Sequence, residues 1–138
     1  MGDTYAGSGL EPTLQAVYDA LKADPQLSGD IGGRVYDEVP PRCPLPYVVV
    51  GEATTVPWRT HTTKGEEITI VIHIFSRQKS TKEAARIFGH VNRVLGDVPL
   101  TVAGYNVVRC YYEDSRTIKE PEGRHIPARY RIQLQEAA

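Results

Sequence analysis

The most regular feature of this chain is the alternation of side chains over positions 66–76. Four isoleucines occupy every second position from 68 to 74, so they point to one face of a predicted strand. The positions between them hold Thr69, Val71, His73 and Phe75. Because this second face is also largely apolar, we expect a helix or another subunit to cover part of it. His73 should be a hydrogen-bonded, half-buried side chain of that face.

A segment close to the end of the chain alternates in the same way. Its predicted inward positions are Ile126, Ala128, Tyr130, Ile132 and Leu134, and its outward positions are Arg129, Arg131 and Gln133. Shorter strands are predicted over 34–36, 47–51, 99–102 and 105–113. Four prolines between positions 40 and 46 interrupt any regular strand there, since each of them lacks a backbone donor.

Two segments have the 3.6-residue period of amphipathic helices. The first places Leu10, Leu14, Val17, Tyr18 and Leu21 on one face, and Pro25 should end it. The second places Ala84, Ile87, Phe88, Val91, Val94 and Leu95 on one face. Ser8–Glu11 and Ser80–Glu83 have the spacing of a capping box, which would begin each helix.

These elements predict an α+β domain in which two helices pack on a mainly antiparallel sheet. Two long hairpin loops are expected, around residues 54–65 and 114–125. The length of 138 residues fits one domain, which we place at 10–138 after a flexible N-terminus at 1–9.

The composition narrows the classes of protein to which this chain can belong. Hydrophobic residues make up 41% of the chain and charged residues 24%, which is typical of a globular domain. The longest apolar run is Tyr47–Val50, and Met1 is followed by polar residues, so we expect neither a membrane span nor an export signal. A balance of 16 Lys and Arg against 17 Asp and Glu argues against binding polyanions through bulk charge.

Candidate chemistry is sparse. The four histidines have no metal-ligand spacing, and the chain contains neither a nucleophile motif nor a phosphate-binding loop. Cys43 and Cys110 are expected to be reduced, with a disulfide between them as the alternative. The adjacent carboxylates Glu66 and Glu67 point to opposite faces of a strand, so they form no acid–base pair. We therefore expect no catalytic residue, no cofactor and no metal.

The candidate interface residues lie on the two predicted hairpin tips. Trp58 and Arg59 combine an aromatic ring with a guanidinium group, the residue types that dominate binding hot spots. The alternative is that Trp58 folds back onto the core. Arg116, Lys119 and Arg124 surround the last hairpin and alternate with acidic residues, which fits a solvated loop or a charge-complementary protein contact.

Five segments carry a family resemblance. In chain order they read LQAVYDALKAD, GGRVYDEVPPRCPLPYVVVGE, HTTKGEEITIVIHIFSR, TKEAARIFGHVNRVLGD and GRHIPARYRIQL. Together they cover residues 10–135 and resemble the tail-completion, or tail-terminator, proteins of long-tailed phages and of phage-derived gene transfer agents.

The resemblance implies a structural protein of the virion or phage-like particle, made in the bacterial cytoplasm and located at the head–tail junction. Such proteins form a ring, typically a hexamer, that caps the tail tube and joins it to the head-side connector. Its partners would be further copies of the chain, the major tail tube protein and the connector or stopper protein. DNA would only pass through the lumen, and no membrane is involved.

Two alternatives stay open. A subunit of the head–tail connector, stopper or neck ring would also be small and free of catalytic groups. A small ligand- or nucleic-acid-binding α+β module belongs to a different class, and it would remain a monomer or dimer in solution, whereas a ring has at least a sixfold mass.

Overall fold

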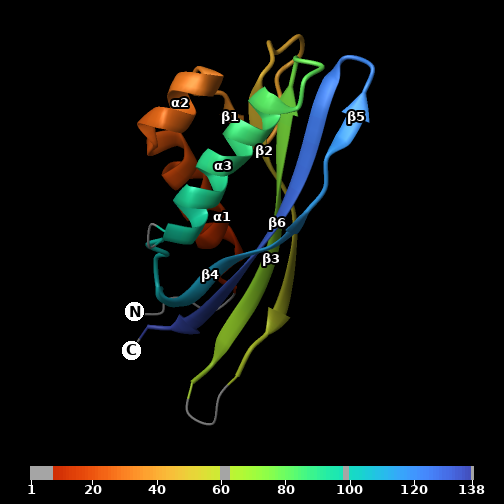
Figure 1. The fold of residues 1–138 in the computed structure, drawn as a ribbon. Helices are drawn as coiled ribbons and strands as arrows, with labels where there is room; N and C mark the ends of the chain where they lie inside the picture. Colours follow the sequence, from red (N-terminus) through yellow and green to blue (C-terminus); the bar gives the residue numbers. More distant parts are fainter. Residues whose placement is uncertain (1–7, 60–62, 98–99, 138) are drawn as a thin grey trace.

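The computed structural model describes residues 8–59, 63–97 and 100–137. These residues form three helices and one six-stranded sheet (Figure 1). The helices are α1 (Leu10–Ala23), α2 (Pro25–Ile31) and α3 (Lys82–Asp97). The strands are β1 (Val35–Tyr36), β2 (Tyr47–Pro57), β3 (Gly65–Ser76), β4 (Tyr105–Ser115), β5 (Ile118–Glu120) and β6 (Gly123–Glu136). The predicted α+β class is confirmed.

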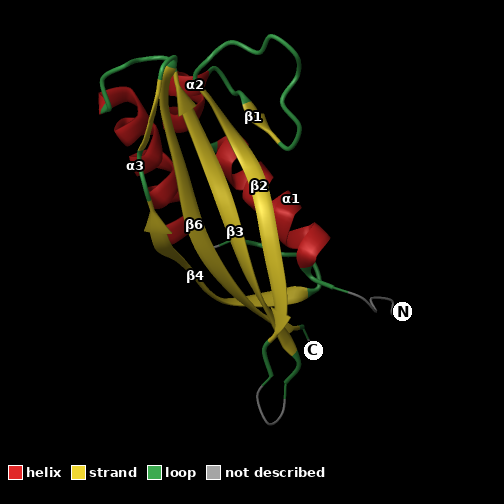
Figure 2. Cartoon of the chain, turned by 90° about the vertical axis from the view of Figure 1, so that its right-hand side faces the viewer, coloured by secondary structure: helices red, strands yellow, loops and turns green. Residues whose placement is uncertain are grey.

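The sheet has the strand order β1–β2–β3–β6–β4, and β5 pairs with the beginning of β6. All neighbouring strands are antiparallel except β1, which runs parallel to β2. The longest regular pairing joins β3 to β6, from Gly65 opposite Gln135 to Ser76 opposite Arg124. The three helices lie on one side of this sheet (Figure 2). We call the opposite side the open face.

The core lies between the helices and the inner face of the sheet. The four isoleucines of β3 are fully buried, and so are the inward residues of β6 from Ala128 to Leu134. The apolar stripe of α3 packs onto them, with Phe88 as its half-buried member. The hydroxyl of Tyr130 donates a hydrogen bond to the Asn92 side chain at 3.1 Å, which satisfies this buried tyrosine. Both predicted alternations are therefore confirmed.

A helix that the sequence analysis missed follows α1 directly. Pro25 was predicted to end the first helix, and it does, but it also takes the first turn of α2. The Asp24 side chain accepts a hydrogen bond from the Leu27 backbone N–H at 2.9 Å and caps α2. Arg93 of α3 holds the same carboxylate through two nitrogens, at 3.1 and 2.8 Å. This pairing lowers the pKa of Asp24 and ties α2 to α3.

The two predicted capping boxes are confirmed for the serines and wrong for the acids. The Ser8 hydroxyl accepts a hydrogen bond from Leu10 N–H at 3.1 Å, and the Ser80 hydroxyl accepts one from Lys82 N–H at 3.3 Å. At the start of α1, however, Glu66 of β3 accepts hydrogen bonds from the Gly9 backbone N–H and the Ser8 hydroxyl. At the start of α3, Glu83 accepts a hydrogen bond from the hydroxyl of Ser76 in β3 at 2.6 Å. In both places a residue of β3 takes part in the hydrogen bond that the box assigned to a local partner.

The long loops predicted around 54–65 and 114–125 are shorter than expected. β2 extends to Pro57 and β3 begins at Gly65, so the connection spans 58–64. The other segment forms the end of β4, all of β5 and the start of β6. Both polar segments form strand over part of their length, because the first pairs with β3 and the second pairs with β6. Residues 100–102 of the predicted strand 99–102 are not in a strand, and position 99 lies outside the described residues.

Glycines permit the close approach at both ends of the β3–β6 pair. A side-chain carbon at Gly123 would collide with the backbone oxygen of Ser76, and one at Gly65 would collide with that of Leu134. We expect Gly123→Ala to lower the free energy of unfolding by about 1–3 kcal/mol, because the rigid backbone cannot give way. Chemical denaturation measures this change.

The matched control is Gly89→Ala on the exposed side of α3, where an added carbon meets nothing within 4 Å. It should raise the stability by about 0.5–1 kcal/mol, since alanine is the better helix former. Equal stability of Gly123→Ala and the wild type would contradict the proposed role of this glycine.

Candidate functional site

The open face of the sheet carries the second alternating set of β3. Thr69, Val71, His73 and Phe75 are half-buried there, as side chains of β2, β6 and β4 surround them. No helix of the described chain lies over this face (Figure 2). Of the two coverings that the sequence suggested, a helix of the same domain is therefore wrong. Covering by another subunit stays a prediction.

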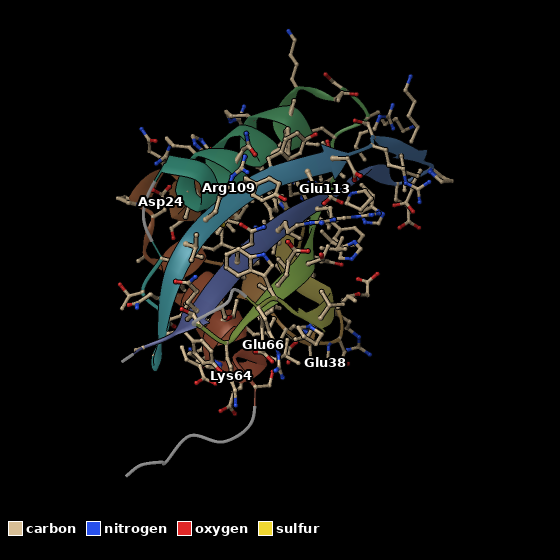
Figure 3. All side chains as sticks on the ribbon, turned by 90° about the horizontal axis from the view of Figure 1, so that it is seen from below. Asp24, Glu38, Lys64, Glu66, Arg109 and Glu113 are labelled. Carbon is tan, nitrogen blue, oxygen red and sulfur yellow. The ribbon has the colours of Figure 1, made fainter. Side chains whose placement is uncertain are left out.

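Ion pairs cross the open face from β3 to β4. Arg131 of β6 lies between two acids, with Glu67 at 3.1 Å and Glu113 at 2.5 Å. Arg129 lies 3.6 Å from Glu113 and 3.7 Å from Asp114. Figure 3 labels Glu113 on β4. Because each charge meets an opposite one, this half of the face presents a nearly neutral polar surface.

Aromatic and histidine rings cover the other half of the open face. Tyr47, Phe75 and His125 stack in sequence, with ring centroids 5.2 and 4.2 Å apart. His73 Nδ1 lies 2.8 Å from His125 Nε2, and its Nε2 lies 2.5 Å from a carboxylate oxygen of Glu52. We call Glu52, His73 and His125 the histidine pair with its acid. His73 is thus half-buried and hydrogen-bonded, as predicted.

Two members of this group, His125 and Glu52, have shifted pKa values. Burial lowers the pKa of His125, and the neighbouring His73 lowers it further, because a second charge so close is unfavourable. The pKa of Glu52 is lowered by a hydrogen bond from its own backbone and by the one from His73. Folding therefore favours the neutral form of His125 and the charged form of Glu52 more than the unfolded chain does.

A pocket of about 460 Å³ lies beside the histidines. Ser115 lines it, and its hydroxyl is hydrogen-bonded to the Tyr112 hydroxyl at 2.7 Å and to no histidine in the described part of the chain. Both cysteines are free, and burial raises the pKa of Cys110 to about 11, which keeps it a thiol at neutral pH. Within residues 8–59, 63–97 and 100–137, no three potential ligands cluster around a metal position.

The five predicted interface residues form two separate groups. Trp58 and Arg59 lie on the β2–β3 hairpin, and Arg116, Lys119 and Arg124 lie around β5 at the opposite end of the molecule (Figure 1). Trp58 is half-buried, and it is not part of the hydrophobic core, while its backbone N–H donates to Gly65 O at 2.9 Å.

The basic group around β5 is only partly available for contacts. Arg116 and Lys119 are exposed, whereas Arg124 is half-buried and donates to the Gly123 carbonyl at 2.8 Å. Lys119 and Arg124 are directly opposite in the β5–β6 ladder, so two like charges share one tip. The structure therefore favours Arg116 and Lys119 over Arg124 as contact residues.

Sequence reasoning missed two features of the surface. His73 and His125 are 52 residues apart, so only the β3–β6 register brings them together. The second feature is a pocket of about 580 Å³ between α1 and β1, which we call the α1–β1 groove. Its lining includes Leu10, Leu14, Tyr18 and Tyr36 together with Glu11, Asp37 and Glu38. The stripe of the first helix was the available signal, since Leu10, Leu14 and Tyr18 are only half-buried.

In the described part of the chain, no helix is long and apolar enough to cross a membrane. The family model described as tail completion protein gp17 matches residues 15–135. No curated protein matches the chain in sequence.

Two solved structures share the fold. A chain from the "Virion of native gene transfer agent (GTA) particle" superposes with a TM-score of 0.84 at 23% identity, covering 94% of this chain and 99% of that one. The gp17 protein of bacteriophage SPP1 superposes with a TM-score of 0.59, also at 23% identity, covering 93% and 92%. In both superpositions, almost the whole length of each chain is aligned.

The lowered pKa of His125 predicts a pH-dependent stability. The unfolded state takes up a proton on this histidine at its ordinary pKa of 6.5, before the folded state does, so stability should fall as the pH drops from about 7 to about 5. The stability that Glu52 contributes is present above its ordinary pKa of 4.5 and is lost at lower pH. Thermal melts of the wild type and of His125→Gln separate the two effects, because the variant should lose less stability between about pH 7 and pH 5.

The control for this experiment is His90→Gln, which changes a histidine on α3 that lies 3.2 Å from Asp30, outside the cluster. Because this variant keeps Glu52, His73 and His125, it should retain the loss of stability that these three residues cause. If His125→Gln is as sensitive as the wild type in that range, the loss does not come from His125.

Proposed function

This chain belongs to the family of tail completion protein gp17, and we propose that it forms a ring that caps a phage-like tail tube and joins it to the head-side connector. As a tail completion protein, it is a structural component of a virion or phage-like particle and is located in the tail. The similarity to a chain from a gene transfer agent particle supports the same location. The family indicated by the sequence segments is thus confirmed.

The open face of the sheet carries the proposal of a ring. Val71, His73 and Phe75 are half-buried there, and the three helices all lie on the other face of the sheet. A domain of this size gains stability when a neighbour covers such a surface, because burial of apolar area is favourable. Further copies of the chain are the first partners. We propose six of them, in line with the family resemblance.

The two hairpin ends supply contacts beyond the ring. The β2–β3 hairpin extends past the helical layer, and β5 lies at the other end of the sheet (Figure 1). We propose that one end contacts the major tail tube protein and the other contacts the head-side connector or stopper protein. DNA passes through the lumen without being bound in a specific site, and no reaction is catalysed.

A connector or stopper ring is the second candidate. It shares the lack of catalytic groups and the need for ring contacts, and the exposed cations Arg116 and Lys119 would suit either neighbour. The family description as a tail completion protein favours the terminator. Binding to the tube protein separates the two functions, since a terminator binds the tube end and a stopper binds only the head-side ring.

The test of the proposed function combines native mass and electron microscopy. We expect the purified chain to form rings of sixfold mass, alone at micromolar concentration or on tubes of the tail tube protein from the same particle. Micrographs should show one ring at the end of each tube. A monomer under both conditions would contradict the ring, and rings that ignore the tube but bind the connector would support the stopper function.

The two hairpin ends should respond differently to salt. Trp58→Ala removes an aromatic anchor and should weaken the ring's attachment by about 1–3 kcal/mol at any ionic strength. Lys119→Glu reverses an exposed charge and should weaken attachment at low salt, with little effect near 1 M salt, where charges are screened. Co-sedimentation with tubes and with connector rings measures both.

Gln78→Ala serves as the control, because this exposed side chain lies outside the strands and both groups of candidate residues. If Trp58→Ala lowers the melting temperature while attachment is unchanged, Trp58 has a structural role and is not an anchor. An effect of Lys119→Glu that does not depend on salt would exclude the electrostatic role.

A further inference from the structure

We propose that the β4 edge of one copy docks into the α1–β1 groove of the next copy. This inference rests on the proposed ring and specifies the contact that builds it. Two surfaces carry it, one at each edge of the sheet, since β4 and β1 are the terminal strands of the five-strand path (Figure 2). Within the described chain, each surface has charges without an ion-pair partner in one subunit, and the two surfaces are opposite in charge.

The α1–β1 groove is apolar at its base and acidic among its exposed residues. Half-buried side chains of Leu10, Leu14 and Tyr18 from α1 face the beginning of β1 across a volume of about 580 Å³. The charged residues that line it are all acids, namely Glu11, Asp37 and Glu38, and all are exposed. Among the described residues, none of these carboxylates forms an ion pair.

Lys22 is a cation beside the groove. Its ammonium group lies 5.5 Å from the centre of the Tyr18 ring, where a cation–π interaction holds it. The groove therefore keeps an excess of negative charge over an apolar base. A suitable occupant offers an apolar side chain next to a cation.

The β4 edge offers this combination. Val108 is 50% exposed, the largest exposed fraction among the large apolar side chains described. It lies at a shift in the β4–β6 register, between Val107 opposite Leu134 and Arg109 opposite Gln133. Arg109 is exposed, and its guanidinium group lies 4.1 Å from the centre of the Tyr111 ring. It pairs with no carboxylate in the part of the chain that the structure describes.

The irregularities of β4 determine how the contact is made. A second register shift lies between Tyr112 and Asp114, so the edge is not a regular template for another strand. A neighbour therefore meets β4 through side chains. In the proposed contact Val108 enters the apolar base, and Arg109 meets the carboxylates of Asp37 and Glu38. Figure 3 labels Arg109 and Glu38 on well-separated parts of one subunit, so the pair forms only between copies.

The position of the two surfaces favours a second copy as the occupant. Different patches at opposite edges generate a head-to-tail interface, and such interfaces close into rings when the rotation allows it. An isologous dimer, in contrast, would stop at two copies. The same pair of patches can therefore recur at each junction between neighbouring copies of a ring.

The first test introduces a carboxylate at the β4 edge. Val108→Glu places this carboxylate in the acidic groove and should weaken assembly at least tenfold, measured by native mass across a dilution series. The control is Gln78→Glu, which adds the same carboxylate at an exposed position outside the strands and outside the α1–β1 groove. It should assemble like the wild type. Circular dichroism and melting curves establish that both variants are folded.

The second test exchanges the charges. Arg109→Glu alone and Glu38→Arg alone should each weaken assembly about tenfold, and the double variant should regain most of the loss. Rescue would not follow from a general effect of charge on folding or solubility. Additive losses in the double variant would overturn the pairing of Arg109 with Glu38.

A mixing experiment tests the head-to-tail arrangement. Val108→Glu subunits keep an intact groove, and Leu14→Glu subunits keep an intact β4 edge. Each should be monomeric alone, and the equimolar mixture should give heterodimers, because only one productive contact is possible. A mixture that stays monomeric overturns the proposal.

The outcomes distinguish this contact from the ring itself. If Val108→Glu still forms rings of wild-type affinity, the docking is wrong and the ring stands. If the wild type is monomeric with and without tubes, the proposed contact and the proposed ring are both contradicted. If the groove variant assembles normally but no longer binds the tube or the connector, the groove belongs to that partner, and the contact proposed between copies is overturned.

Discussion

The pairing of β3 with β6 is the constraint on which the rest of this molecule depends. All 12 residues of β3 pair in one unbroken register, and Gly65 and Gly123 allow the backbones to approach closely at its two ends. Since side chains alternate with a period of two, this register places the isoleucines of β3 and the inward residues of β6 on the same face of the sheet. The helices then have one surface on which to pack, and the strands β2 and β4 take the remaining edges.

The same register determines the chemistry of the open face. It sets His73 beside His125 and Glu67 beside Arg131, with residues on β2 and β4 completing each group. These contacts compensate charges and hold the rings together. Burial raises the pKa of the Cys110 thiol and of the Tyr130 hydroxyl, so both groups stay protonated at neutral pH.

Helices cover only one face of the sheet, so the surface of the domain differs from side to side. Such a surface suits a subunit of a larger assembly. One edge ends in the short strand β1 beside an acidic groove, and the other ends in the irregular strand β4 with its exposed valine and arginine. Hairpins lie at the two remaining ends. In the ring that we propose, the two edges contact neighbouring copies and the two hairpin ends contact the proteins above and below.

Local patterns in the sequence determined the long strands, two helical stripes and the inward residues of β6, because period and burial are linked within one segment. They also identified the family. Tertiary structure decided what depends on partners distant in the chain: Glu66 and not Glu11 completes the start of α1, and Arg93 stabilises the cap of α2. It also decided that Trp58 and Lys119 lie at opposite ends, and that His73 meets His125. Such contacts arise from strand register and helix packing, which bring together residues that no local spacing connects.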